Sequence, residues 1–551
     1  MTHTADPTTT SQTNSSNTHL DAHQLAVEKE QRKVEEEIRI DDIGLGTMLR
    51  DSYAIVARKG EDGSLYIRSA PGDPSSPRDW PKWKRYGIVL LASFLNNLVT
   101  IGVSSYSTGT TEIASEFNVS AEVAILGLTL FILGFALGPL FLAPLSEFFG
   151  RRPVYLISWF LFTVFQIPLA VPPNIATILV FRFLQGFTGA APLCNTGGVV
   201  HDLFSRDGGG IAVGIYGLSS TSGPPLGNAF GGYIVQTLGF RYLYWIQLAI
   251  FGGFWFIIYF CLPETRDTII MMKKAKALRE ITGNPKIYAL HEQDREEPGR
   301  LWKVSLARPI VFLVKEPITY LSAAINGLTF GIIFLANQAF PLIFGAGNGG
   351  HNWTHVGAIN LTYLSFVVGA LIGFGLQPIQ ERFYANATAR NGGKSVPEAR
   401  FYSSLFGIWL LPIGLFLAAW TSFPSINFMA PIVGFTLFGI GFYMIITAIL
   451  NYIVDGYGHY SASALGAVVF IRNLVACVFP LFSDQMFAKV RAFLFWPLFA
   501  SSADQTAHPA RKPMGNNFGR FFGLSPSPHP LLSILQRPND SFQQPLLQRT
   551  L

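Results

Sequence analysis

Three charged side chains stand between two long apolar runs near residue 150. Glu147, Arg151 and Arg152 lie in "LSEFFGRRPVY", residues 145–155, with Gly150 between the acid and the arginines. At the border of two apolar runs, Gly150 lets the chain reverse, the arginines stay at a membrane interface, and Glu147 can pair with an arginine or a helix N-terminus. Plain interface anchors would not need Glu147. We therefore predict a latch that joins helices in one state and releases them in another.

A further arginine lies where charge is costly. Arg182, in "RFLQGFTGA", falls several residues inside an apolar run, and a buried arginine in lipid needs a partner or a water-filled cavity. Gln185 and Gly189 follow at the spacing of one helix face. We favour a functional role for Arg182 over the alternative, an arginine paired only to hold helices together.

A third stretch, "GIYGLSSTSGPPLGNAFGG" at 214–232, combines small residues with prolines. Gly223 and Gly227 are four residues apart, which leaves one bare helix face that a neighbouring helix can approach closely. Pro224 removes a backbone donor and bends the helix. Ordinary small-residue packing is the alternative interpretation.

These residues must be positioned by membrane-spanning helices. The chain of 551 residues is 49% hydrophobic and only 13% charged, about half the charge of a soluble domain. Apolar runs of bilayer-spanning length lie near 86–107, 122–145, 153–171, 175–199, 211–235 and 242–262, and then near 318–341, 355–378, 401–420, 427–453 and 460–486. Six spans, a polar loop and five spans are predicted.

Charge asymmetry orients the spans. With the N-terminus inside, nearly all loop Lys and Arg fall on the cytosolic side and Arg241 is the outer exception, as the positive-inside rule requires. The predicted domains are a disordered cytosolic leader (1–80), an N-terminal six-helix half (81–262), a cytosolic central loop (263–316), a C-terminal half (317–486) and an atypical tail (487–551). Sequons at Asn118 and Asn352 lie in predicted outer loops, so both are candidate glycosylation sites.

The tail breaks the pattern. After Met486 the apolar core is too short to span, and the following stretch is Pro-rich and basic. Eleven spans would leave that basic tail outside, against the charge rule. We interpret the twelfth helix as missing or replaced, as a shifted reading frame or a retained intron would do; a genuine eleven-span variant and a short re-entrant helix are the alternatives.

Together these motifs resemble a known family. Residues 143–152, "APLSEFFGRR", are similar to motif A of the major facilitator superfamily, although Ala143 replaces its first Gly and Phe148 a common basic residue. Residues 182–190 resemble its motif B, and 214–232 its motif C, the antiporter motif of drug exporters. About 80–486 resemble a fungal 12-span drug:proton antiporter. The resemblance implies an all-α polytopic membrane protein of two six-helix halves around a central cavity that opens alternately to each side.

The resemblance further implies export driven by protons, with no other cofactor, by a monomer in the plasma membrane. No acid lies in the middle of a span, where the charges are Arg182 and Arg472; the nearest inner acids are Glu147, Asp202, Glu264 and Asp455, and Glu147 is our candidate for proton sensing. Small lipophilic substrates, neutral rather than cationic, are expected. Polar side chains on the spans expected to line the pocket, each with a helix–helix hydrogen bond as its alternative role, are Asn96, Asn97, Gln185, Asn195, Asn326, Gln338, Tyr443 and Asn451.

Other functions compete with this prediction. An uptake carrier or facilitator for a metabolite or polyamine would use the same fold, although motif C argues against it, and an inactive truncated transporter or a non-transporting receptor would explain the tail. The sequence shows no hydrolytic triad, nucleotide loop or metal-ligand spacing, so we expect no enzyme and no metal site. Loop charge of this kind does not indicate a nucleic-acid partner, and the expected partner is the bilayer itself.

Overall fold

The computed structural model describes residues 38–39, 55–59, 64–69, 73–204, 209–289, 292, 310–345, 351, 353–392, 396–457 and 461–494. The predicted tail, from which the sequence analysis inferred that the twelfth helix is missing or replaced, lies outside these residues apart from the end of the last helix. That last helix crosses the boundary between two compact units, Met1–Phe482 and Ser483–Leu551.

All eleven predicted spans are helical, with bounds that agree to within a few residues except where a helix runs on beyond its apolar run. In the first half they are α2 (Lys82–Ser104), α4 (Ala121–Phe149), α5 (Arg151–Val164) with α6 (Gln166–Ala170), α7 (Ile175–Leu203), α8 (Gly209–Leu238) and α9 (Phe240–Cys261). In the second half they are α12 (Pro317–Phe344), α13 (Val356–Leu361) with α14 (Leu364–Gly375) and α15 (Gln377–Arg390), α16 (Tyr402–Trp420), α17 (Met429–Tyr457) and α18 (Ser461–Leu494).

Local sequence explains several helix ends. Ser120 accepts a hydrogen bond from the backbone N–H of Val123 at the start of α4, and Asn174 caps α7 through the N–H of Thr177. Gly150 and Gly239 have positive φ angles of 104° and 89° and separate α4 from α5 and α8 from α9. A residue with a side chain would be strained at both turns, so glycine fixes where these helices reverse.

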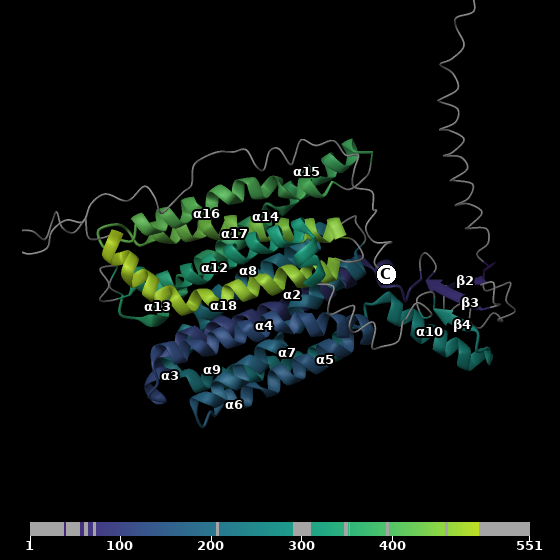
Figure 1. The fold of residues 1–551 in the computed structure, drawn as a ribbon, viewed down its shortest axis with the longest axis horizontal. Coiled ribbons are helices and arrows are strands. Elements are labelled where there is room, and N and C mark those ends of the chain that lie inside the picture. The colour runs from purple at the N-terminus through teal and green to yellow at the C-terminus, as the bar shows by residue number, and fades with distance from the viewer. Residues whose placement is uncertain are drawn as a thin grey trace, which may run out of the picture. The chain divides into compact units, whose positions relative to one another are not determined.

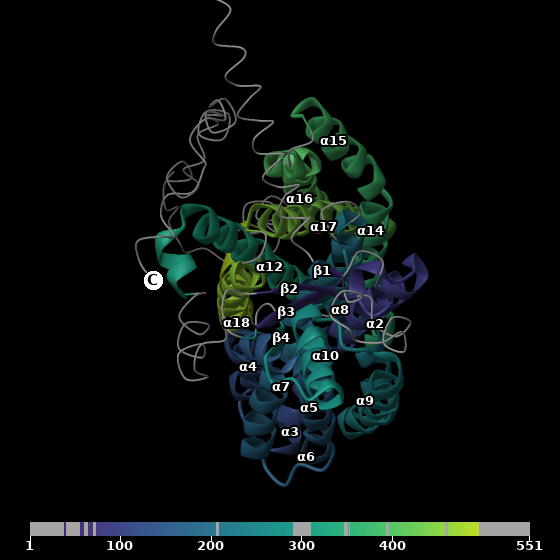
Figure 2. The ribbon, with the colours of Figure 1, turned by 90° about the vertical axis from the view of Figure 1, so that its right-hand side faces the viewer.

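The helices form two groups with four helices between them (Figures 1 and 2). On one side α4 packs on α7, and on the other α17 packs on α14 and α16; α2, α8, α12 and α18 lie between. Glycines set these close approaches: a Cβ on Gly134 would overlap the backbone of α7, and one on Gly414 would lie 2.5 Å from the carbonyl oxygen of Gly434. Small residues at helix crossings are the device by which helices associate in lipid.

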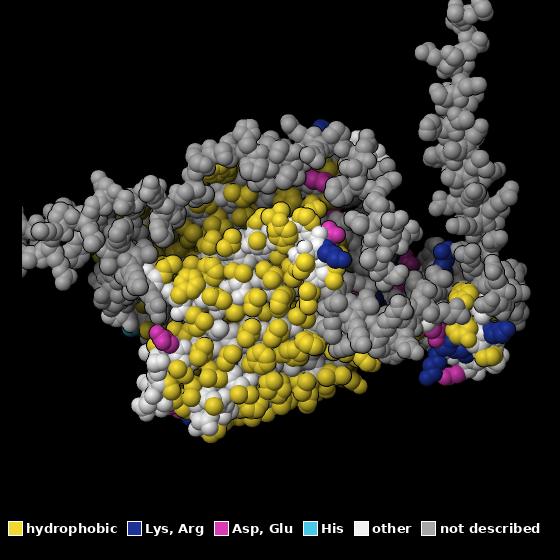
Figure 3. Space-filling view, viewed as in Figure 1, with side chains coloured by type: hydrophobic (Ala, Val, Ile, Leu, Met, Phe, Trp, Pro, Cys, Tyr) yellow, Lys and Arg dark blue, Asp and Glu magenta, His cyan; other side chains and the backbone are white. Residues whose placement is uncertain are grey.

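The lateral surface of the helices is apolar. Figure 3 shows a broad field of hydrophobic side chains over the helices with few charged ones among them, and Phe260, Phe406, Trp409 and Trp420 are each at least 70% exposed. In the described residues ten helical segments are long and apolar enough to cross a membrane. The α8 helix is not among them, since its run of Gly, Ser and Thr lowers its hydrophobicity. This surface would be unstable in water, so the chain is an integral membrane protein.

The sequence analysis predicted a disordered leader, but part of the leader is folded. Its strands β1 (Ile38–Arg39), β2 (Ile55–Lys59) and β3 (Leu65–Ser69) pair antiparallel in order, and β4 (Ile287–Ala289) of the central loop adds parallel to β3. Helix α10 (Asp267–Thr282) packs beside the strands (Figure 2). Ile67 of β3 and Met271 and Leu278 of α10 belong to a small hydrophobic core that is separate from the core of the helical bundle. The prediction missed this sheet because its strands are short and its parallel pair joins residues more than 200 positions apart.

A buried ion pair ties the leader to the central loop. Lys274 Nζ lies 2.6 Å from Asp73 Oδ2, and both side chains are at least 94% buried. Burial opposes ionisation of Asp73, but hydrogen bonds from Lys274 and Ser75 outweigh it, so the pKa of Asp73 is lowered. Lys274 is therefore engaged inside the protein and not at the lipid surface.

Candidate functional site

One of the predicted latch residues, Arg151, is a buried arginine at the turn between α4 and α5. The Arg151 guanidinium, 2% exposed, donates from Nε to Asp202 Oδ2 at 3.1 Å, at the end of α7. Its Nη1 donates to Ser146 Oγ at 2.7 Å, and Ser146 in turn donates to Asn195 Oδ1 at 2.7 Å. A side chain on Gly198 would overlap the guanidinium. Arg151 therefore joins α4, α5 and α7 at one end of the bundle, which we call the latch end.

Glu264, in the link between α9 and α10, closes the same cluster. Its carboxylate accepts from the backbone N–H groups of Arg151 and Arg152 at 2.9 and 3.2 Å, the first residues of α5. A carboxylate at a helix N-terminus satisfies free donors and complements the helix dipole. Gly150 leaves room for it, because a Cβ there would overlap the carboxylate. The glycine is thus required both by its backbone angle and by its neighbour.

Glu147 does not make the contacts predicted for it. Within the described part of the chain it has no hydrogen bond or ion pair; Asp202 pairs with Arg151, and Glu264 caps the helix. Glu147 is only partly buried and lies near enough to Arg151 and Arg266 to act on them through its charge. Burial, and then the Arg151 guanidinium, lower the pKa of Arg266. Its role in proton sensing stays a prediction.

The second half repeats the arrangement. Arg400, just before α16 and 2% exposed, donates from Nε to Asp455 Oδ2 at 2.7 Å and from Nη1 to Glu381 Oε1 at 2.6 Å. Asp455 ends α17 as Asp202 ends α7. Glu381, on α15, also lies against the first turn of α8, where a Cβ on Gly210 would overlap its carboxylate. The latch of the second half therefore reaches across to the first half.

Sequence reasoning missed Glu381 and Arg400 as latch residues. A signal was present: an acid at the end of the eighth span and an arginine at the start of the ninth occupy the places that Glu147 and Arg151 hold around the second and third spans. Because the two halves of such bundles repeat each other, comparing these positions would have found the second latch.

Arg182, on α7, contacts α2 and α4 and lies away from the latch end. Its guanidinium donates to the backbone carbonyls of Gly102 and Val103 at 3.0 Å each and of Gly127 at 3.3 Å, and to Gln185 Oε1 at 3.3 Å. The rings of Tyr106 and Phe131 lie 4.5 and 4.4 Å from its centre. No carboxylate pairs with it in the described residues. Two of the carbonyls belong to the last turn of α2, where the helix dipole is negative, so they partly offset its charge.

The glycine run of α8 faces α2, as its spacing predicted. Side chains on Gly223 and Gly227 would overlap Thr100 and Ser104 respectively. Ser104 Oγ donates to the carbonyl of Pro224 at 2.7 Å, which lies inside the helix. The run therefore serves the α2–α8 contact, one of the most extensive in the bundle.

The polar residues predicted to line a pocket separate into two groups. Four of them make contacts between helices or in the latch. Asn96 donates to Ser219 and Ser220, and Asn97 donates to Ser222. Asn195 accepts from Ser146 in the latch, and Tyr443 donates to the carbonyl of Gly214 at 3.1 Å. Asn451 donates within its own helix. Among the described residues, buried polar atoms lack a hydrogen-bond partner at Asn96 Oδ1, Asn195 Nδ2, Gln185 Nε2 and both amide atoms of Asn326. Gln338 is partly buried.

The predicted glycosylation sites are only partly described. Asn118 is exposed in the turn before α4, at the end of the bundle opposite the latch. Asn352 lies outside the described residues. Accessibility at Asn118 is what an oligosaccharide would require.

The two halves meet along α8. At the latch end Glu381 and Tyr443 contact its first turns, and at the opposite end Gln236 Oε1 accepts from the backbone N–H of Gly357 at 2.6 Å. A bundle of two repeated halves, joined along shared helices and carrying a charged latch in each, defines a membrane transporter rather than an enzyme. The sequence agrees, because residues 90–480 match the Major Facilitator Superfamily. The chain belongs to this family.

Its relatives include named fungal transporters. The efflux pump FUB11 of Gibberella moniliformis is 34% identical over 76% of this chain and 70% of its own length. The MFS-type efflux pump MFS2 of Trichophyton rubrum is 34% identical over 82% of this chain and 76% of its own. The multidrug transporter mdrA of Aspergillus fumigatus is 33% identical, covering 81% and 73%.

A solved structure supports the fold. The proton:xylose symporter XylE superimposes with a TM-score of 0.55 and 15% sequence identity, over 76% of this chain and 91% of XylE. At this identity the likeness concerns the fold alone. The predicted major facilitator fold is thereby confirmed.

Proposed function

We propose that this transporter exports small lipophilic molecules by proton antiport through alternating access. The observation that carries the proposal is the pair of latches at one end of the bundle, centred on Arg151 and Arg400. Each holds its own half together with buried charge, and Glu381 extends the second latch to α8 of the other half. Buried ion pairs break only at high cost, so they favour discrete states over gradual movement.

The direction of transport and the class of substrate are inferred from the relatives of this chain and from the charges of its spans. The curated relatives are named as efflux pumps or multidrug transporters. We found no carboxylate at mid-depth in the described spans, so a cationic substrate would have no counter-charge there. These observations favour export of lipophilic, non-cationic molecules. The glycine run that packs α8 on α2 resembles motif C, the antiporter motif of drug exporters, which argues for export over uptake.

Proton coupling needs an acid whose protonation state changes during the cycle. Four described acids lie in the latches, where Asp202, Glu381 and Asp455 contact arginines and Glu264 contacts a helix N-terminus. Loss of an arginine partner raises the pKa of a carboxyl group, so opening a latch favours proton uptake there. Glu147 stays a candidate for the same role, since it lies close to Arg151.

The remaining features of the proposal concern placement. The leader and central loop lie in the cytosol because their Lys and Arg, with those of 146–152, form the positive side of the protein. The latch end is then the cytosolic end. The proposed location is the plasma membrane, with the proton as the coupling ion, no other cofactor, and a monomer as the working unit.

The test is efflux of a neutral fluorescent lipophile, Nile red, from yeast that lacks its own drug exporters. Cells producing the full chain should retain less dye than empty-vector cells at external pH 5. The difference should shrink at pH 7.5 and disappear with a protonophore. Greater dye retention than in the vector control would indicate uptake instead, and equal retention across a panel of lipophiles would indicate an inactive transporter. Cysteine labelling at 146–152 and 263–316 checks that both face the cytosol.

A further inference from the structure

Arg472 on α18 is a buried cation to which the described residues supply no counter-charge. It lies near the middle of the apolar stretch Ala464–Ser483 and is 2% exposed. In the described part of the chain its guanidinium makes one hydrogen bond, from Nε to Asn473 Oδ1 at 3.1 Å, and its buried Nη1 has no partner. The latch arginines Arg151 and Arg400, by contrast, each pair with a carboxylate.

An equally unusual amide lies on the helix that faces Arg472. The guanidinium stacks over the ring of Phe330 on α12, 4.1 Å from its centre. Gly327 allows the two helices to approach, since a Cβ there would lie 3.6 Å from Arg472 Cα. Asn326, one turn before Phe330 on the same face of α12, is fully buried, and neither its Nδ2 nor its Oδ1 has a partner within the described ranges. Donors on two helices are thus buried beside an aromatic ring without acceptors.

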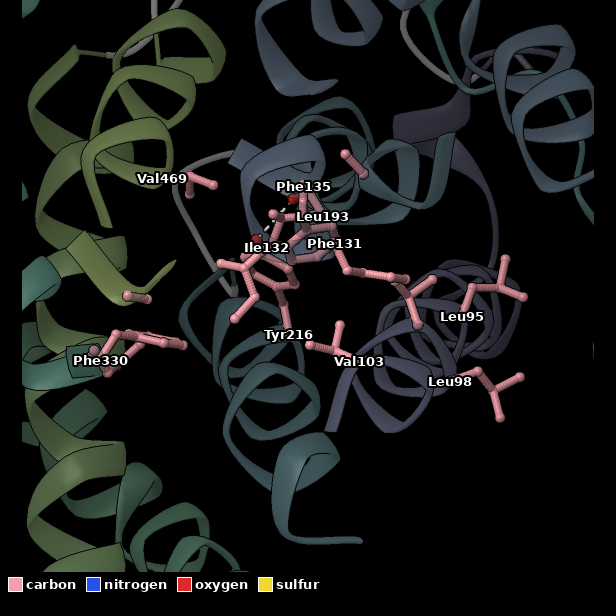
Figure 4. Packing of buried hydrophobic residues seen from close by; sticks show 14 of the residues in the cluster. Leu95, Leu98, Val103, Phe131, Ile132, Phe135, Leu193, Tyr216, Phe330 and Val469 are labelled. Atoms are coloured by element: carbon pink, nitrogen blue, oxygen red, sulfur yellow. Dashed lines mark hydrogen bonds between the residues drawn. The ribbon is translucent and has the colours of Figure 1, made fainter. Parts of the chain in front are cut away.

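This cluster lies where the two halves of the transporter meet. Asn473, next to Arg472, donates to the carbonyl of Phe135 on α4 at 3.3 Å. Figure 4 shows Phe330 and Val469, from the second half, pointing toward Tyr216 and its neighbours in the first half. Val469 precedes Arg472 by one helical turn, so both belong to the face of α18 that is turned to the other half.

Arg182 is, by comparison, a buried arginine whose guanidinium has hydrogen-bond acceptors. Its donors reach three backbone carbonyls and an amide oxygen. Arg472 has no such set among the described residues, and an uncompensated charge at this depth is strongly unfavourable. The missing partner must supply negative charge and acceptor oxygens, and Phe330 supplies a surface for a ring. A carboxylate attached to an aromatic or other apolar body meets these needs.

We propose that Arg472, with Asn326 and Phe330, binds the carboxylate end of a lipophilic organic acid at the interface between the halves. The assignment deepens the proposed function, on which its meaning for export rests, because it names monoanionic amphiphiles as a substrate class. Binding itself is independent of transport and can be measured without it.

The test compares 2-naphthoate with its neutral counterpart 2-naphthamide, using the full chain purified in detergent. Carboxylic acids of this kind are ionised at neutral pH. Equilibrium dialysis should give tighter binding of naphthoate, and Arg472→Gln should weaken it at least about tenfold, as expected for a charge-assisted contact, while binding of naphthamide changes little. Arg472→Lys, which keeps the charge, should lose less. Arg241→Gln, which removes an exposed arginine paired with Glu116, is the matched control and should bind as the unaltered chain does.

A second variant covers the case in which Arg472→Gln does not fold. Asn326→Asp adds a carboxylate that competes for Arg472, so naphthoate binding should again weaken by about tenfold or more while both charges stay buried together. Equal binding of naphthoate and naphthamide, or naphthoate binding that is unchanged in the folded variants, would overturn the assignment. Nile red efflux measured in the same variants separates the two hypotheses: efflux without Arg472-dependent naphthoate binding contradicts only the anion site, and binding without efflux contradicts only the proposed function.

Discussion

Replacing Gly227 with alanine tests whether the α2–α8 contact is as close as the structure shows. The added Cβ would lie 2.5 Å from the carbonyl oxygen of Ile101 and 3.0 Å from its Cα. Both are backbone atoms in the interior of α2, so no side-chain rotation relieves the overlap. The helices must separate by ~0.9 Å, the difference between 2.5 Å and the 3.4 Å at which ordinary contact begins.

The expected magnitude combines two opposing effects. Overpacking a well-packed contact costs about 1–3 kcal/mol, whereas alanine gains roughly 0.5–1 kcal/mol over glycine inside a helix. The net destabilisation should be about 1–2 kcal/mol. Separation of the helices also stretches the hydrogen bonds that Asn96 and Asn97 donate to Ser219, Ser220 and Ser222. We therefore expect the rate of efflux to fall by a larger fraction than the free energy of unfolding.

Gly253→Ala on α9 is the matched control. No heavy atom lies within 4 Å of its added Cβ, so the same change in the same kind of helix should leave the melting temperature equal or slightly raised. The assay is thermal unfolding in detergent followed by size-exclusion chromatography, together with Nile red efflux in yeast. Equal melting temperatures and equal efflux for the two variants would refute the argument from close packing.

Three further perturbations have defined outcomes. Asp202→Asn leaves Arg151 buried without its ion pair, which should destabilise the protein by about 3–5 kcal/mol; a melting temperature unchanged from that of the original chain would count against the latch. Arg182→Lys cannot supply the same fork of donors, so we expect efflux to be lost while the protein still reaches the membrane, and normal efflux would show that the carbonyl contacts are dispensable. Because the pKa of Asp73 is lowered in the fold, its stabilising contribution is complete above its unfolded pKa of about 3.9 and disappears as pH falls through the lower folded value. At pH 7, Asp73→Asn should therefore speed hydrogen exchange around Lys274, with the difference vanishing in strong acid; equal exchange at pH 7 would contradict the pairing.

Sequence reasoning predicted the helices well because length and hydrophobicity alone decide which segments cross a bilayer. For the first latch and for the α2–α8 contact, it also identified the residues on one side: Arg151 and Gly150 in the latch, and the glycines of α8. It offered Glu147 as the acid that pairs with an arginine or a helix N-terminus, whereas Asp202 and Glu264 make those contacts. Asp202 ends the span that follows Arg151, and nothing in the local pattern distinguishes it from Glu147.

The pocket residues show the same limit. Asn96 and Asn97 look identical in sequence to ligand-binding amides, yet their NH₂ groups donate to hydroxyl groups and a carbonyl of α8. At Asn326 neither amide atom has a partner among the described residues, and only packing reveals this. Polar type and depth can be read from a sequence, whereas whether a partner already exists depends on three-dimensional neighbours.

The parallel pairing of β3 with β4 has a consequence for biogenesis. The β2–β3 hairpin can form as soon as the leader leaves the ribosome, but its free edge receives β4 only after the six helices between them have entered the membrane. An open strand edge attracts other chains. Closure of the sheet therefore marks completion of the first half, and translation that stalls before residue 287 leaves that edge exposed to chaperones and quality control.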